Sequence, residues 1–366
     1  MSLPPLIGHL EPRQRLAKAV QAGRLPQVIL LTGPAGVGKQ RLALWLAQLL
    51  FCERPTGEPC GTCRGCRVVS GLAHPDLHWM VPIPRPKASD PDRQVEEAAE
   101  AIAQVLEERR RQPFYGVADG MAIHPMASVR LLQRRARLTP VEGGWRVFIV
   151  GEADRLVPQE SSPEAANALL KLLEEPPANT LFVLTAVDPR RMLPTIRSRA
   201  VAVRLSRLSD GEVESFLLSQ QPSSLARLSA KALGERVTMA EGSIGRVVAG
   251  GDEGGAAYQA ANELLEAVVA GAGPTLERVL RQAPWSARGE FTAMLDALAD
   301  TLGEAARGTV GQPMRRPVPQ ALMRHRSPEP LLKAMEHVAD AREAAWGNVN
   351  PQILLAVLGE ELAEVL

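Results

Sequence analysis

A glycine-rich loop near the N-terminus places the strongest constraint on how this chain folds. The run Gly33-Pro-Ala-Gly-Val-Gly-Lys39 follows an apolar segment and precedes a helical pattern. Glycines at this spacing let backbone N–H groups converge on phosphate oxygens, and the N-terminus of the following helix adds partial positive charge. The lysine supplies a point charge for the terminal phosphates. The loop therefore predicts a P-loop domain, with Gly33, Gly36, Gly38 and Lys39 as candidate nucleotide-binding residues.

The first two hundred residues alternate short apolar runs with helical patterns. Strands are predicted at Gln27–Thr32, Leu77–Val81, Trp145–Val150, Thr180–Thr185 and Val201–Leu205. Several of these runs are nearly continuous in Val, Ile, Leu and Phe, as in a parallel sheet that is buried on both faces. Helices are predicted between them at Arg41–Phe51, Val129–Arg137 and Glu164–Glu175. The alternation predicts a doubly wound α/β domain over residues 1–205.

The rest of the chain breaks this alternation. Residues 83–120 contain a proline-rich piece and a charged helix at about 94–111, which we interpret as a surface insertion with a solvated helix face and no catalytic role. Strand patterns end after residue 205. A small helical lid is predicted at 206–249, followed by a glycine-rich break at 250–255 and a larger all-helical domain at 256–366.

The composition excludes some classes of protein and leaves others open. The 42 basic and 41 acidic side chains nearly cancel, so net charge gives no argument for a nucleic-acid partner. No apolar run approaches the roughly 18 residues of a membrane span, and the N-terminus lacks a signal-peptide pattern. We therefore expect a cytoplasmic protein without a membrane partner.

All four cysteines lie close together, directly after the helix that follows the P-loop: Cys52, Cys60, Cys63 and Cys66. In a reducing compartment this spacing favours metal ligation over disulfides. Gly57, Gly61 and Gly65 permit the tight turns of a tetrahedral site. A closed four-sulfur site has no open position for a substrate, so the sequence predicts a structural Zn²⁺. Buried free cysteines and an iron–sulfur cluster are the alternatives, and no other feature indicates redox chemistry.

Two residues depart from an active P-loop ATPase. The residue after the lysine should be Ser or Thr, whose hydroxyl holds Mg²⁺, and here it is Gln40. The strand Val147–Val150 should end in a metal-binding aspartate, and Gly151 stands there, followed by Glu152 in the place of the water-activating base. Both departures affect the same ion. They predict lost hydrolysis, with binding of ATP or ADP that is weak or absent.

Several further motifs resemble the AAA+ clamp-loader subunits of bacterial DNA polymerase III. The zinc loop after the P-loop helix is one, and the others are His74-Pro-Asp76, Asn167–Pro177, Asp188–Ala200 and Asn348–Gln352. The resemblance is dense up to residue 205 and sparse beyond. It implies an AAA+ module, a lid and a helical collar that assembles into a five-membered ring. The implied partners are gamma/tau and delta subunits, the sliding clamp and primer-template DNA.

The resemblance also assigns a role to Arg199. It stands where the family has the arginine of a Ser-Arg-Cys motif, which reaches into the ATP site of the neighbouring subunit, and Ala200 replaces the cysteine. A guanidinium is permanently charged and forks onto phosphate oxygens, so it can stabilise charge that develops there. The resemblance therefore implies an arginine finger acting in trans.

Two sensor positions of the family are shifted by one residue. Ala186 stands where a sensor threonine is expected, with Thr185 one place earlier, and Arg246 is displaced within Gly242–Arg246. With Gln40, these shifts favour the non-hydrolysing delta-prime branch of the family. An active gamma-like ATPase that uses Lys39 and Glu152 is the alternative. A stand-alone zinc-bearing DNA-binding protein is disfavoured by the balanced charge.

A basic helix face is the candidate for DNA contact. Arg130, Arg134 and Arg137 are spaced four and three residues apart, so they share one face of the predicted helix. In related clamp loaders the equivalent helix approaches the DNA inside the ring. Contacts of this kind would be to duplex phosphates, independent of sequence and sensitive to salt. An ordinary solvated basic face is the alternative.

Overall fold

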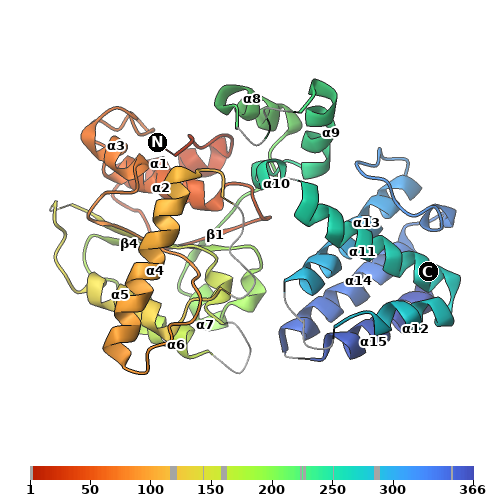
Figure 1. Ribbon diagram of the computed structural model, residues 1–366. Coiled ribbons are helices and arrows are strands. Elements are labelled where there is room, and N and C mark those ends of the chain that lie inside the picture. The colour runs from red at the N-terminus through yellow and green to blue at the C-terminus, as the bar shows by residue number, and fades with distance from the viewer. Residues whose placement is uncertain are drawn as a thin grey trace. The chain divides into compact units, whose positions relative to one another are not determined.

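Five parallel strands form the centre of the first part of the chain in the computed structural model (Figure 1). They are β1 Val28–Thr32, β2 Leu77–Met80, β3 Arg146–Val150, β4 Thr180–Ala186 and β5 Val201–Arg204. The strand order is β2-β3-β4-β1-β5, and every described neighbour pair is parallel. All five strands lie within one residue of their predicted bounds, and the predicted parallel sheet is confirmed.

The structure describes residues 3–115, 122–142, 144–157, 163–222, 225, 228–249, 251–283, 289–347 and 349–366. These residues form two compact units, which meet in the sequence at residues 249–250. Among them, no helix is both long and apolar enough to cross a bilayer.

The sheet is the core of the first unit because β3 and β4 are buried along their whole length. Phe148 and Phe182 stack across these strands with ring centroids 5.1 Å apart. Helices surround the sheet: α1 Leu10–Gln21, α2 Lys39–Leu50, α3 Arg64–Ser70, α4 Pro91–Arg111, α5 Met126–Ala136, α6 Glu164–Glu174 and α7 Pro194–Arg197. Helix α2 begins at the P-loop lysine and buries most of its residues, so the loop is fixed against the sheet.

The predicted insertion is more deeply integrated than a solvated surface helix. An antiparallel bridge between Ile83 and Ile123 closes its base. Helix α4 starts at an Asp90 cap, and it packs on α5 with buried apolar side chains that include Ile102. The interpretation of α4 as solvated was wrong for this inner face, because it treated every charged position as exposed. Residues 116–120 of the insertion lie outside the described residues.

Three helices complete the first unit: α8 Asp210–Gln220, α9 Ala230–Ala240 and α10 Ile244–Ala249. A capping box between Ser209 and Glu212 starts α8, where each side chain bonds the backbone N–H of the other residue. Their small core includes Val213, Phe216 and Val247. The division of a separate lid at 206–249 stays a prediction.

The second unit is all-helical. It contains α11 Gly251–Ala270, α12 Ala272–Leu280, α13 Glu290–Thr309, α14 Glu329–Ala344 and α15 Pro351–Val365, drawn teal to blue in Figure 1. Their shared core includes the fully buried Leu298, Leu302 and Leu355. Residues 251–255, predicted as part of a break, belong to α11. Glycine costs a helix about 1 kcal/mol per residue, and the packed remainder of α11 outweighs that cost.

Candidate nucleotide site and metal centre

The P-loop lies at the carboxyl end of β1, where parallel α/β sheets bind their ligands. Gly33, Gly36 and Gly38 have φ angles of 146°, 74° and 105°, which residues other than glycine rarely adopt. Space is short as well, because a Cβ on Gly36 would lie 2.3 Å from the Ser243 hydroxyl. The three predicted glycines therefore shape the loop.

Lys39 is folded back onto its own loop. Its ammonium donates hydrogen bonds to the carbonyl oxygens of Gly33 at 2.8 Å and Pro34 at 2.7 Å. Only 8% of the residue is exposed. Burial lowers the pKa of Lys39 to about 8, against the opposing attraction of Asp154 and Glu152. The lysine is thus already bonded within its own loop, and its role in binding phosphate stays a prediction.

Gln40 and Gly151 meet in space. A Cβ on Gly151 would lie 3.1 Å from Gln40 Nε2 and 3.2 Å from its Cδ. The longer side chain at position 40 thus lies in tight contact with the position in which an aspartate at 151 would begin. Magnesium needs an octahedral set of oxygen ligands, usually with one or two carboxylates. These two positions supply no hydroxyl and no carboxylate, so they do not provide the Mg²⁺ ligands of an active P-loop.

Arg109, at the end of α4, reaches this same point and was missed by the sequence analysis. Its Nη1 donates to Gln40 Oε1 at 3.0 Å. The guanidinium lies over the rings of Trp79 and Tyr115, 4.6 and 4.1 Å from their centroids. Only 4% of Arg109 is exposed. The charged helix therefore contributes a buried cation to the P-loop region.

Two acidic residues follow Gly151 at the carboxyl end of β3. Glu152 adopts a left-handed φ of 54°, and its carboxylate pairs with Arg155 at 2.9 Å. Its backbone N–H donates to Thr185 Oγ1 at 3.0 Å, which gives that buried threonine a structural partner. Asp154 accepts hydrogen bonds from the backbone N–H groups of residues 187 and 188. Both carboxylates therefore hold local structure at the site's edge.

The first turn of α10 and the serine that precedes it contact the P-loop directly. Ser243 Oγ donates to the carbonyl of Ala35 at 2.9 Å, and the Gly245 N–H donates to the carbonyl of Gly36 at 3.1 Å. Arg246, the predicted second sensor, pairs with Glu241 at 3.6 Å. The structure thus brings this segment to the loop through Ser243 and Gly245.

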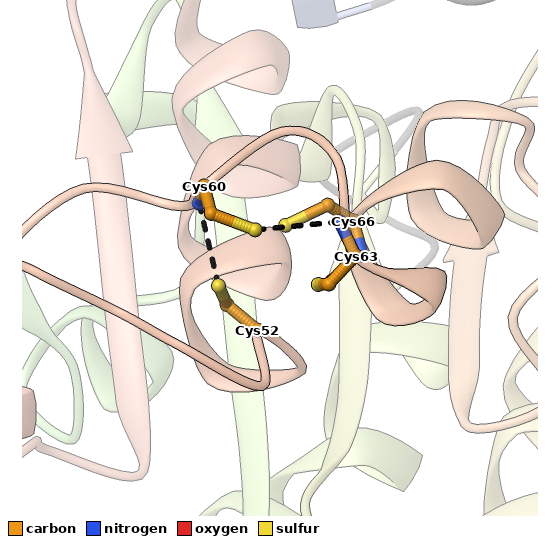
Figure 2. A group of neighbouring side chains, drawn as sticks. All are labelled: Cys52, Cys60, Cys63 and Cys66. Atoms are coloured by element: carbon orange, nitrogen blue, oxygen red, sulfur yellow. Dashed lines mark hydrogen bonds between the residues drawn. The ribbon is translucent and has the colours of Figure 1, made fainter.

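The four cysteines form one cluster beside the first turn of α3 (Figure 2). Their sulfur atoms all lie within 4.8 Å of one another. Backbone N–H groups bind the sulfurs: Cys60 N–H donates to Cys52 at 3.3 Å, Cys63 N–H to Cys60 at 3.3 Å and Cys66 N–H to Cys63 at 3.4 Å. Such donors stabilise thiolates, which are the form that binds metal.

The local backbone explains how the cluster closes. Gly57 and Gly61 have φ angles of 89° and 72°, as expected for tight turns. Gly65 serves close packing instead, since a Cβ there would lie 2.0 Å from the Phe51 carbonyl oxygen. The backbone N–H groups of Cys63 and Thr62 lower the pKa of Cys60 to about 6.

A tetrahedral zinc–sulfur site fits this cluster. Zinc–sulfur bonds of about 2.3 Å place the sulfurs roughly 3.8 Å apart. Since no sulfur–sulfur separation exceeds 4.8 Å, reaching that spacing needs a contraction of about 1 Å at most. Four clustered cysteines with thiolate-stabilising donors are consistent with a structural metal site, and no fifth ligand joins the group among the described residues.

Arg199 lies on the surface, two residues after the end of α7. Its Nη1 donates to the Thr195 carbonyl at 2.7 Å, and its Nη2 pairs with Glu174 at the end of α6. About a third of the side chain, 32%, is exposed. The guanidinium is therefore held in one orientation while part of it faces solvent.

The three arginines of the basic face lie on or directly after α5. Arg134 and Arg137 are exposed and Arg130 is half-buried. Arg134 pairs with Asp92 of α4, so part of the face's charge is compensated within the chain. The DNA contact stays a prediction.

Comparison with known proteins identifies the family. The model of the family described as "DNA polymerase III, delta subunit" matches residues 8–209. The chain is 30% identical over 225 residues to the DNA polymerase III subunit delta' of Bacillus subtilis, covering 61% of this chain and 56% of that protein. It is 33% identical over 187 residues to the delta' subunit of Escherichia coli, covering 51% and 44%.

A gamma/tau subunit from Mycobacterium tuberculosis H37Rv is 31% identical over 199 residues, covering 54% of this chain and 27% of the relative. The matched part spans about half the length of the two delta' relatives. Percentage identity alone does not separate the delta' relatives from gamma/tau, whereas the family model spans more than half of this chain. The chain therefore belongs to the DNA polymerase III delta-prime subunit family of AAA+ clamp-loader relatives.

Proposed function

We propose that the chain is a non-hydrolysing, stator-like subunit of the DNA sliding-clamp loader in replication. The observation that carries this proposal is the contact of Gln40 with Gly151 and Arg109. Gln40 lies against the position of the missing aspartate. Its side-chain oxygen accepts a hydrogen bond from Arg109. Hydrolysis of ATP by P-loop proteins depends on a metal that bridges the phosphates. A site without the usual hydroxyl and aspartate ligands for that metal supports a role in assembly.

Arg199 would give such a subunit a role in catalysis by a neighbouring subunit. Arg199 would complete the ATP site of a neighbouring subunit and stabilise charge on the transferring phosphoryl group. Its partial exposure and its attachment to Glu174 and Thr195 support this role, because a finger must be both accessible and oriented. On contact with a neighbour, the guanidinium would exchange Glu174 for phosphate oxygens.

The partners follow from the same assignment. Gamma/tau and delta subunits would be bound through the helical second unit acting as a collar. The sliding clamp and primer-template DNA would meet the assembled ring in the cytoplasm. The exposed Arg134 and Arg137 would contact duplex phosphates, with Arg130 beside them. The metal held by the four cysteines would be Zn²⁺ in a purely structural role.

The test is reconstitution of the loader with and without this chain. ATP turnover is measured for the purified chain and for the loader on primed DNA. We expect background turnover for the chain alone and loss of clamp loading when it is omitted. Turnover by the chain alone at the rate of an ordinary AAA+ ATPase, abolished by Lys39→Ala, would instead support the gamma-like ATPase.

A further inference from the structure

We propose that Arg109 replaces the divalent ion of the P-loop, so that this site holds a diphosphate group without Mg²⁺. This goes beyond the stator role, which requires only that hydrolysis is lost. The established P-loop pattern needs a hydroxyl at position 40 and a carboxylate at position 151 to hold the ion. Here a buried guanidinium lies against the side chain at position 40 instead.

The replacement conserves charge. A divalent ion bound by one aspartate contributes a net charge of about +1, from +2 and −1. The guanidinium of Arg109 with an uncharged residue at position 151 contributes +1 as well. Lys39 adds the same positive charge in both arrangements. The chain has therefore exchanged an ion and its ligand for a covalently attached cation of equal net charge.

The guanidinium is also fixed in place. Its face lies against the rings of Trp79 and Tyr115, and one donor is bonded to Gln40. Two aromatic faces compensate a buried cation by cation–π attraction, which is stronger when the cation is desolvated. A guanidinium has five N–H donors in a rigid fork that matches phosphate oxygens. Arg109 is therefore oriented before any anion binds.

The hydrogen bonds of Lys39, the second cation of the site, indicate that a diphosphate binds with modest affinity. Lys39 donates to two carbonyl oxygens of the loop, and it must give up at least one of these bonds to reach a phosphate. The Ser243 and Gly245 contacts with the loop restrict its opening as well. We expect affinity for a diphosphate in the micromolar to millimolar range, which corresponds to about −8 to −4 kcal/mol.

Isothermal titration of the purified chain tests this directly, with inorganic pyrophosphate and with ADP as probes. Each probe is titrated in EDTA and again with excess Mg²⁺. We expect binding in EDTA at least as tight as in Mg²⁺, since the free ion competes with Arg109 for the probe. Equal affinity for both probes indicates a diphosphate site, and tighter binding of ADP indicates added nucleoside contacts. Absence of binding in EDTA, or binding that requires Mg²⁺, overturns the proposal.

Variants identify the cation. Arg109→Gln should weaken binding of pyrophosphate in EDTA at least tenfold, and Arg109→Lys should retain part of it. Arg111→Gln is the matched control, because it removes the same charge from an exposed position on the same helix. Circular dichroism and bound zinc establish that each variant is folded. If Arg109→Gln does not fold, the comparison of Arg109→Lys with Arg111→Gln decides. A folded Arg109 variant that binds like the unmodified chain refutes the role of Arg109, whatever the outcome of the ATP turnover test.

Discussion

The amide of Gln40 lies against Gly151, with its Nε2 3.1 Å from the position that a Cβ on residue 151 would take. Gln40 and Gly151, the two departures from an active P-loop, therefore pack against each other. The side chain that is too long at position 40 fills the space left by the side chain missing at position 151. This contact explains why restoring either position alone would not rebuild a metal site.

A double-mutant cycle should reveal this coupling. Gly151→Asp alone forces a carboxylate into Gln40 and should destabilise the first unit by about 1–3 kcal/mol through overpacking. Gln40→Ser removes the obstacle, so the double variant should recover stability, with a coupling energy of about 0.5–3 kcal/mol. Urea unfolding of the three variants measures it.

Additive effects of the two substitutions would contradict the contact. ATP turnover by Gln40→Ser alone should stay at background, because position 151 still lacks a carboxylate. Turnover restored by that single change would show that residue 151 is not needed to hold the ion.

Purified protein should contain close to one zinc per chain by elemental analysis. Cys63→Ser is the informative variant, because Cys63 is the N-cap of α3 and its sulfur accepts the Cys66 N–H. Serine is among the best N-cap residues, so the substitution keeps the cap while it removes one thiolate. We expect loss of zinc and lower thermal stability without a change in any catalytic property of the reconstituted loader.

Removal of zinc by a chelator should reproduce the loss of stability. Full zinc content in Cys63→Ser would show that the cluster does not hold the ion in the manner described. Four freely titratable thiols in the folded, unmodified chain would likewise show that the cysteines do not bind zinc.

The buried His124 and the half-buried His78 make the first unit sensitive to acid. Burial lowers the pKa of His124, and likewise that of His78, to about 4 from the ordinary 6.5. The carbonyl of Gly151 accepts a hydrogen bond from His124 Nε2 at 2.7 Å, which raises the pKa of His124 in part, but the burial of the ring outweighs it. Between pH 6.5 and 4 the unfolded chain therefore binds more protons than the folded one. Stability should fall as pH falls through this window, by about 1.4 kcal/mol per pH unit for each histidine.

The measurement is urea unfolding at several pH values for the unmodified chain, His78→Gln and His124→Gln. Each variant should have a shallower dependence on pH between 6.5 and 4, whatever its absolute stability. An unchanged slope in both variants would assign the acid sensitivity to other groups.

The sheet could be predicted because its strands carry their own signal. β3 and β4 are nearly continuous apolar runs, and burial on both faces allows little else. The cysteine cluster could be predicted equally well, since all four cysteines lie close together in the sequence and need no long-range contact to meet. The P-loop glycines define their own backbone conformation.

The contact between Arg109 and Gln40 could not be predicted in the same way, because 69 residues separate them. Arg109, Arg110 and Arg111 form one basic run, and nothing local distinguishes them. In the structure, Arg109 is 4% exposed, while the side chains of Arg110 and Arg111 are 37% and 77% exposed. Only the packing of α4 determines which arginine turns inward. The Arg199–Glu174 pair is of the same kind, since it joins the ends of two separate helices.

The proposed arginine finger gives the most direct prediction about the assembled loader. Arg199→Ala should leave folding, zinc content and ring assembly intact, because the side chain lies at the surface and bonds only Thr195 and Glu174 among the described residues. It should lower DNA-stimulated ATP hydrolysis and clamp loading by the reconstituted complex. An arginine acting in trans contributes on the order of 10³-fold or more at its own site. The loss for the whole complex will be smaller, because the other subunits keep their own sites.

Two further variants separate the finger from a simple surface charge. Arg199→Lys should rescue poorly, since an ammonium cannot fork onto two phosphate oxygens. Arg197→Ala is the matched control, because it removes an exposed arginine two residues away on α7. Size-exclusion chromatography of each reconstituted complex establishes that the ring has formed before rates are compared. An Arg199→Ala complex that assembles fully and loads clamps at the unmodified rate refutes the finger. A rate that falls equally in Arg197→Ala would assign the effect to the charge of this surface rather than to Arg199.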